Sequence, residues 1–341
     1  MPFAVVDFQD RRPIWTLPEA AAAALRNGVP DGWRLRFVDA LTDGSGDGGA
    51  AASPQALEAV LGAHVYLGAG VPIDVIRAGS DLRWVHSGSA GVSPAVIEAL
   101  RGRDVVLTNS AGTHGPPVAE TAIAMMLHFA RGLDVAVRGQ AGGRWDREPF
   151  DAAPGPVREV AGSTVGIVGY GGIGAGVGRR AAALGARVLG LRRRQADADG
   201  VAEVLTGPEG LRRILRESDY VVLCVPETGA TRSLIDRAAL ALMRPSAVLI
   251  NVARGRLVDE AALAEALRAG RLRGAASDVF AAEPLPPDHP LWNAPNMLVT
   301  PHVSAITPRY WDREVALILD NFERWESGAP LRNVVDVDAG Y

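Results

Sequence analysis

The 341-residue sequence contains no lysine, and arginine supplies all 35 of its basic side chains. This absence excludes a Schiff-base lysine, a lysine general base and a Walker-type nucleotide loop, since each of them needs the lysine amine. A GC-rich coding bias is the simplest cause of the absence. With 39 acidic residues and a net charge of −4, the chain also lacks the positive field that favours nucleic-acid binding. We therefore expect no nucleic-acid partner.

Cysteine is almost absent as well, because Cys224 is the only one. A single cysteine forms neither a disulfide framework nor a thiolate cluster, and no other ligand spacing typical of a metal site occurs, so we predict no metal. Cys224 lies in the apolar run 220–225, which favours an inert, buried thiol. No apolar run approaches 18 residues, and no basic segment followed by an apolar one opens the chain. We expect a cytoplasmic protein without a membrane partner.

Short apolar runs alternate with helical patterns along most of the chain. In the first third, strands are expected at 3–8, 34–39, 65–67, 83–86 and 105–108, and a long helix follows at 118–138. Later strands are expected at 164–168, 187–191, 220–225, 247–251, 274–279 and 297–300. Alternation of this kind predicts an α/β fold with parallel sheets, and the length predicts two domains. We expect two similar, Rossmann-like, doubly wound lobes with a cleft between them.

The strongest motif is a glycine-rich turn between a strand at 164–168 and a helix at 173–184. Gly169, Gly171 and Gly174 have the G-x-G-x-x-G spacing. The first glycine permits a tight turn, the second lets the backbone approach a pyrophosphate, and the third lets the helix pack on the sheet. In this context the motif predicts a bound dinucleotide, with its phosphates at the start of the helix. The residues expected to line it are Gly169, Tyr170, Gly171, Gly172, Ile173 and Gly174.

Arg192, Arg193 and Arg194 stand where a carboxylate that binds the ribose of NAD is expected, at the end of the second strand. A guanidinium suits a 2′-phosphate, so the sequence favours NADP(H), with NAD as the weaker cofactor. In the alternative interpretation, the three arginines form a solvated loop that Asp197 and Asp199 partly neutralise.

Three polar side chains follow strands of the second half: Arg254, Glu283 and His302. Together they fit the reduction of a 2-keto acid. Arg254 would hold the substrate carboxylate or carbonyl, and His302 would protonate the carbonyl oxygen as the hydride arrives. Glu283 would bind the other ring nitrogen and favour the protonated ring. Taken singly, each residue has a plainer interpretation as a surface ion pair, a loop carboxylate or a capping histidine.

Small residues also follow a strand of the first third, namely Gly88, Ser89, Ala90 and Gly91. Their backbone N–H groups would form a nest for the substrate carboxylate. A plain turn before the next helix is the alternative.

Long segments of the chain resemble the D-isomer-specific 2-hydroxyacid dehydrogenases, which include glyoxylate and hydroxypyruvate reductases. The matching segments are GIVGYGGIG, LCVPETGATRSLID, MRPSAVLINVARGRLVDEAALAEALRAGRLRGAASDVFAAEPLPPDHPLW and NMLVTPHVSA. The resemblance implies that Arg254, Glu283 and His302 are the catalytic residues. It also implies that Asp278 contacts the nicotinamide end, and that Pro226, Thr231 and Val252 line the cofactor site.

The same resemblance implies a domain organisation. Residues 1–108, completed by 305–341, would form a flavodoxin-like substrate domain, and residues 109–304 the NAD(P)-binding domain. A homodimer would join through the nucleotide domains, with the helix at 118–130 and an arm at 142–156 at the interface. The alternative function is a dinucleotide-sensing, co-repressor-like binding protein. The substrate is expected to be a small 2-keto or D-2-hydroxy acid, but its side chain is left open.

Overall fold

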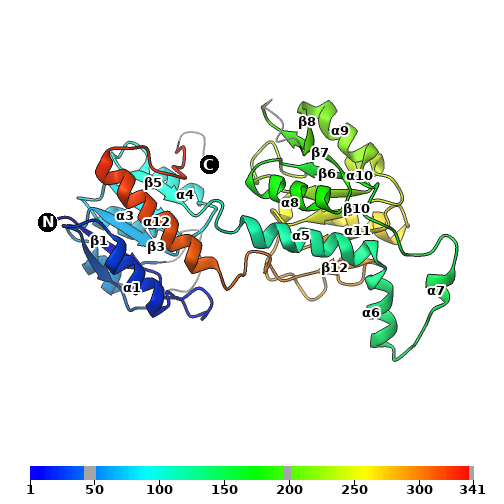
Figure 1. Cartoon of the computed structure of the whole chain (residues 1–341), viewed down its shortest axis with the longest axis horizontal. Helices are drawn as coiled ribbons and strands as arrows, with labels where there is room; N and C mark the ends of the chain where they lie inside the picture. Colours follow the sequence, from blue (N-terminus) through cyan, green and yellow to red (C-terminus); the bar gives the residue numbers. More distant parts are fainter. Residues whose placement is uncertain (42–50, 195–200, 338–341) are drawn as a thin grey trace. The chain divides into compact units, whose positions relative to one another are not determined.

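The computed structural model describes residues 1–41, 51–194 and 201–337. The chain divides into two compact units, here called unit 1 (Met1–His114 with Ile306–Tyr341) and unit 2 (Gly115–Ala305). Each unit is an α/β layer structure around one parallel sheet, which confirms the predicted α/β fold with two doubly wound lobes (Figure 1).

Unit 1 contains a five-stranded sheet with the order β2-β1-β3-β4-β5, in which all neighbours are parallel. This is the flavodoxin-like order, in which the strand order reverses next to β1. The strands are β1 (Phe3–Asp7), β2 (Arg34–Phe37), β3 (Val65–Gly68), β4 (Trp84–Ser87) and β5 (Val106–Asn109). The helices are α1 (Glu19–Gly28), α2 (Pro54–Ala59), α3 (Ile73–Ala78), α4 (Pro94–Leu100) and α12 (Tyr310–Ser327).

The two faces of this sheet have separate cores. Leu25 of α1 and Phe322 of α12 pack with Trp84 on one face, and Val75 of α3 and Leu100 of α4 pack on the other. The C-terminal helix is therefore an integral layer of unit 1, although almost 200 residues separate it from the rest of the unit in sequence.

Unit 2 contains a seven-stranded sheet with the order β12-β11-β10-β9-β6-β7-β8, again entirely parallel. The strands are β6 (Thr164–Val168), β7 (Arg187–Arg192), β8 (Ala202–Thr206), β9 (Tyr220–Leu223), β10 (Val248–Asn251), β11 (Gly274–Ser277) and β12 (Met297–Val299). The α-helices are α5 (Gly115–Ala130), α6 (Leu133–Ala141), α7 (Glu148–Asp151), α8 (Gly172–Ala183), α9 (Gly207–Glu217), α10 (Arg237–Leu242) and α11 (Glu260–Arg268). The strand order reverses between β6 and β9, and a doubly wound sheet binds its ligand at such a reversal.

The structure of unit 2 differs from the sequence prediction in two places. The single helix expected at 118–138 is two helices, α5 and α6, because Gly132 takes a left-handed conformation with φ 65°. Strand β8 was missed because Glu203 interrupts its short apolar pattern. Glu203 is tolerated there since β8 is an edge strand, on which Glu203 pairs with Arg187 and Arg213.

Cys224 directly follows β9, and burial raises the pKa of its thiol to about 12. A thiol with so high a pKa is not a nucleophile near neutral pH, in agreement with the inert role expected for it. None of the described helices is both long and apolar enough to cross a bilayer. The cytoplasmic location stays a prediction.

Candidate active site

The glycine-rich turn lies at the strand reversal, between β6 and α8. Gly169 has φ 101°, and the N–H groups of Gly169 and Tyr170 donate to the carbonyl of Leu191 at 3.1 and 2.7 Å. A Cβ on Gly169 would come within 2.7 Å of the Cys224 backbone, and one on Gly174 would collide with the Gly169 carbonyl. These two glycines therefore serve the packing of strand, turn and helix.

Gly171 and Gly172 differ, since a Cβ on either would meet no atom within 4 Å. The space above them is open, at the start of a 12-residue helix whose first N–H groups have no intrahelical acceptor. Tyr170 is buried instead and packs against Gly178 and Gly190. The turn thus fits a pyrophosphate at Gly171, Gly172 and the N-terminus of α8.

Arg192 is the last residue of β7, and it directly follows Leu191, whose carbonyl holds the glycine turn. This position is where a dinucleotide would place its ribose. Arg192 is half-buried, and Arg193 and Arg194 are exposed. Asp197 and Asp199, the proposed neutralising residues, lie outside the described residues.

The other residues expected at the cofactor site form the loops after β9 and β10. The Thr231 hydroxyl donates to the Pro226 carbonyl at 2.7 Å and accepts the Thr228 N–H at 2.7 Å, so it closes the loop that follows β9. Pro226 is exposed, whereas Val252 is buried in the core directly after β10. Pro226 and Thr231 are therefore accessible to a ligand, and Val252 is nearly covered.

His302 and Glu283 form the central pair of the site. The His302 Nδ1 lies 2.7 Å from the Glu283 Oε2, and Glu283 Oε1 accepts the Phe280 N–H at 2.8 Å. The side chains remain 47% and 37% exposed, respectively. Because Nδ1 is hydrogen-bonded to Glu283, Nε2 is the ring nitrogen of His302 that can contact a substrate.

The turn that carries His302 is held by Asp278. His302 has φ 53°, a left-handed conformation that is uncommon for residues other than glycine. Its N–H donates to the Asp278 carbonyl at 2.8 Å. The Asp278 carboxylate accepts the Thr300 hydroxyl at 2.5 Å, the Val303 N–H at 2.9 Å and the Ser304 N–H at 2.8 Å.

The Asp278 side chain is 0% exposed. Three hydrogen bonds to its carboxylate and one to its backbone carbonyl make Asp278 a support for the loop that carries His302. Contact with a nicotinamide stays a prediction for this residue.

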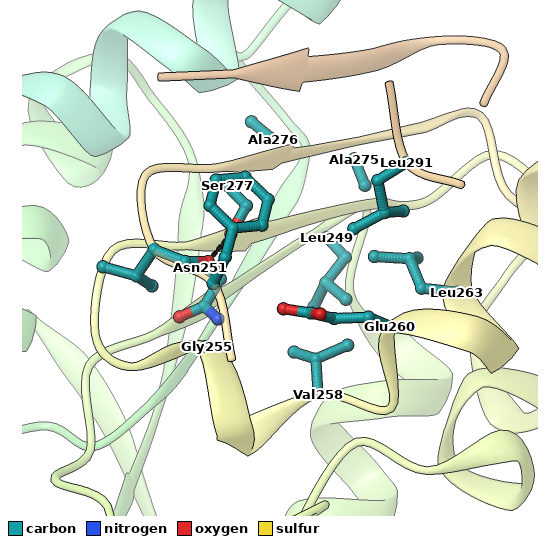
Figure 2. Close-up of a pocket in the computed structure, with 12 residues that line it drawn as sticks. Leu249, Asn251, Gly255, Val258, Glu260, Leu263, Ala275, Ala276, Ser277 and Leu291 are labelled. Atoms are coloured by element: carbon teal, nitrogen blue, oxygen red, sulfur yellow. Dashed lines mark hydrogen bonds between the residues drawn. The ribbon is translucent and has the colours of Figure 1, made fainter. Parts of the chain in front are cut away.

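Arg254 is exposed and leaves the sheet at the end of β10. Its Nη1 donates to the Ala253 carbonyl at 2.8 Å. Asn251 fixes this turn from within, because its Nδ2 donates to the Arg254 carbonyl at 2.9 Å and its Oδ1 accepts the Ala253 N–H at 3.1 Å. Gly255 follows without a side chain, and Figure 2 shows it next to Asn251. A Cβ on Gly255 would collide with the Phe280 backbone.

The nest predicted in unit 1 is smaller than expected. The Gly88 N–H already donates to the Gly68 carbonyl at 2.8 Å, and the Ser89 N–H donates to the Ser87 hydroxyl at 3.3 Å. Gly88 is also buried against Phe8 and Tyr310. The prediction that all four residues offer free N–H groups is therefore wrong. Of the four, Ala90 and Gly91 remain as candidate hydrogen-bond donors to an anion.

Two supporting residues escaped the sequence interpretation, Asn251 and Thr300. Asn251 ends the buried strand β10, three residues before Arg254, and Thr300 directly follows the half-buried strand β12, two residues before His302. That placement was a usable signal. In the described ranges, no three His, Cys, Asp or Glu side chains gather as metal ligands would.

Comparison with known proteins adds a family assignment to this geometry. The model of the D-isomer specific 2-hydroxyacid dehydrogenase NAD-binding domain matches residues 123–304. A D-3-phosphoglycerate dehydrogenase of Methanocaldococcus jannaschii is 33% identical over 82% of this chain and 53% of its own length. A glycerate dehydrogenase of Methylorubrum extorquens is 33% identical over 82% of this chain and 88% of its own.

Among solved structures, an NADPH-dependent glyoxylate/hydroxypyruvate reductase of Sinorhizobium meliloti, in complex with NADP and sulfate, superposes with a TM-score of 0.78. It is 30% identical, and the match covers 100% of both chains. The chain spans about half the length of the phosphoglycerate dehydrogenases that it matches.

The glycine turn yields a paired prediction that separates packing from ligand contact. Gly174→Ala should lower the melting temperature, because its Cβ collides with backbone. Gly171→Ala should leave the melting temperature almost unchanged and weaken NADPH binding, because its methyl enters only the open space. Thermal unfolding and a fluorescence titration with NADPH measure both effects. Unchanged affinity in Gly171→Ala, with wild-type stability, would place the pyrophosphate elsewhere.

Proposed function

Because the chain belongs to the D-isomer specific 2-hydroxyacid dehydrogenase family, we propose that it is an NAD(P)-dependent enzyme that interconverts a 2-keto acid and a D-2-hydroxy acid. The observation that carries this proposal is the Glu283–His302 pair at 2.7 Å, in the same unit as Arg254 and the dinucleotide turn. In this proposal, unit 2 is the nucleotide-binding domain and unit 1 the substrate-binding domain.

The roles follow from the free atoms of each side chain. His302 donates a proton from Nε2 to the carbonyl oxygen of the keto acid, since Nδ1 is held by Glu283. Arg254 presents its exposed guanidinium to the substrate carboxylate or carbonyl. When bound, the nicotinamide supplies the hydride that converts the carbonyl carbon to an alcohol. Reduction thus needs protonated His302, and oxidation needs the neutral ring.

The proposed substrates are small. The Sinorhizobium meliloti relative is named for glyoxylate and hydroxypyruvate, and the Methylorubrum extorquens relative for glycerate. Ala90 and Gly91 are proposed to help bind the substrate carboxylate through their N–H groups. A panel of glyoxylate, hydroxypyruvate and larger 2-keto acids with NADPH tests this choice. The same assay tests the alternative of a dinucleotide-sensing binding protein, which would bind NADPH without turnover.

NADP(H) is proposed as the preferred cofactor because Arg192 lies beside the peptide that holds the glycine turn. The Sinorhizobium meliloti relative contains NADP. NAD is proposed as the weaker cofactor.

A homodimer is proposed to join through unit 2. A groove of about 510 Å³ runs between α5, α6 and the loop before β12. Val137 and Trp292 line it and are 55% and 48% exposed, and Trp145 on the following arm is 95% exposed. Exposed aromatic and aliphatic side chains around a groove are typical of an interface. The proposed occupant is the same surface of a second copy.

The catalytic proposal predicts a specific loss in His302→Gln. Its kcat for keto-acid reduction should fall roughly 10²- to 10⁴-fold, because a positioned general acid contributes that much, while the Kd for NADPH should stay near the wild-type value. Steady-state kinetics and a binding titration measure the two. His64→Gln, in unit 1 directly before β3, is the matched control and should retain full activity. Near-normal turnover in His302→Gln would contradict the proton-donor role.

The cofactor proposal predicts a salt-dependent preference. The wild type should favour NADPH over NADH roughly tenfold or more in kcat/KM at low salt, since one charge-assisted contact is worth about 1.5 kcal/mol or more. The preference should shrink as ionic strength rises, and Arg192→Asp should turn it toward NADH. Arg271→Asp, in the loop before β11, changes the net charge equally and should preserve the preference for NADPH. Equal kcat/KM for both cofactors at low salt would show that the arginines only form a solvated loop.

The dimer proposal predicts a mass of two chains in light scattering at micromolar concentration. Combined Val137→Asp and Trp292→Ser substitutions should shift this mass toward one chain, because they place charge and polarity in the groove. Leu61→Asp, at a 60% exposed position in unit 1, is the control and should leave the dimer intact. A monomer mass for the wild type would reject the proposal.

A further inference from the structure

A second carboxylate–histidine pair lies in unit 2, and the proposed chemistry does not use it. Glu260 is the first residue of α11, and its Oε2 lies 3.2 Å from the His289 Nε2. The two side chains are only 14% and 18% exposed, much less than Glu283 and His302. A largely covered hydrogen bond to a carboxylate is geometrically restrained, because water competes weakly for either partner.

The hydrogen bonds of His289 favour one tautomer. Its Nδ1 accepts the Leu291 N–H at 3.4 Å, so Nε2 carries the proton that it donates to Glu260. The His289 N–H donates to the Pro286 carbonyl at 3.0 Å, and the Trp292 indole donates to the same carbonyl at 2.8 Å. His289 is therefore locked into its own loop, and through that loop it restrains the Glu260 carboxylate.

The other oxygen of Glu260 reaches the loop that carries Glu283. Glu260 Oε1 accepts the Ala281 N–H at 2.8 Å, and the preceding N–H, that of Phe280, donates to Glu283 Oε1 at 2.8 Å. Two consecutive N–H groups are thus held by two different carboxylates. Moving Ala281 would move Phe280, and with it the hydrogen bond that orients Glu283 toward His302.

The same backbone also supports the turn that carries Arg254. Gly255 packs so closely on Phe280 and Ala281 that a Cβ would collide with both. A cavity of about 10 Å³ remains beside this contact, with Glu260, Asn251 and Gly255 among its lining residues, and Figure 2 shows the Glu260 carboxylate pointing into it. This volume holds at most about one water molecule, so the cavity is no ligand site.

We propose that Glu260 and His289 are positioning residues for the reaction, which fix the 280–281 backbone and thereby the Glu283–His302 pair. The inference depends on the proposed function for its kinetic readout, although the geometry that it concerns is measurable without turnover. Neither residue touches the substrate in this role.

The test compares Glu260→Ala with Glu265→Ala in the full-length protein. Both residues lie on α11 and both variants remove a carboxylate that has a side-chain partner, but Glu265 pairs with Arg237 on the exposed side of the helix. Glu260→Ala should lower kcat about ten- to a hundredfold, because small displacements of reacting groups cost that much. The KM and Kd for NADPH should not change.

Glu260→Gln should restore most of kcat, since its amide oxygen can still accept the Ala281 N–H. His289→Gln should lower kcat less than Glu260→Ala does.

A double-mutant cycle shows whether Glu260 acts through Glu283. If it does, Glu260→Ala should add little to the loss already caused by Glu283→Gln, whereas general destabilisation should multiply the two losses. Unchanged kcat in Glu260→Ala, equal losses in Glu265→Ala, or multiplying losses would each overturn the proposal.

Crystal structures of the wild type and of Glu260→Ala and His289→Gln supply the readout that needs no activity. In Glu260→Ala, the Glu283–His302 distance should lengthen from 2.7 Å. In His289→Gln, which leaves the α11 residues intact, it should lengthen less. Retention of the pair in both variants would overturn the proposal. Absence of turnover in the wild type would instead refute the proposed function and leave this structural criterion in force.

Discussion

The close approach of two backbones is the constraint on which the candidate active site depends. Gly255 lies directly against Phe280 and Ala281, where no side chain could fit. This contact brings the loop after β10, with Arg254, against the loop after β11, with Glu283. His302 is held at the same place because its ring is hydrogen-bonded to Glu283. Three residues that lie far apart in the chain thus share one support, and parallel strands make this possible because their carboxyl ends meet at one edge.

Asp278 and Glu283 both follow β11, but they differ in burial and therefore in role. Asp278 is fully buried and its carboxylate accepts three hydrogen bonds from the 300–304 loop, so it acts as a fixed acceptor. Glu283 is partly exposed and divides its oxygens between one backbone N–H and the His302 ring. Only Glu283 has a partner, the His302 ring, that can carry a proton and is open to solvent or substrate. Asp278 instead sustains the left-handed turn at His302.

The features that the sequence could reveal are those with a local physical cause. The glycine spacing around Gly169 required a strand, a turn and a helix in order, and all three lie where they were expected. The break at Gly132 depends on a single backbone conformation inside an apolar pattern. The N–H of Gly88 is taken by Gly68, a neighbour that only the folded sheet of unit 1 supplies. Long-range hydrogen bonds of this kind decide which polar groups stay free, and they leave no periodic trace in a sequence.

Strand β7 illustrates how a chain whose only basic side chains are arginines can use them in two ways. At its start, Arg187 pairs with Glu203 and Glu217 at 3.0 Å each, and these exposed ion pairs help to close the β8 edge of the sheet. Such surface pairs contribute little stability individually. At its end, Arg192 has no carboxylate partner among residues 1–41, 51–194 and 201–337, and it lies next to the glycine turn. One strand therefore carries a guanidinium that is paired with carboxylates at its start, and at its end one without a carboxylate partner among the described residues, next to the turn proposed to bind phosphate.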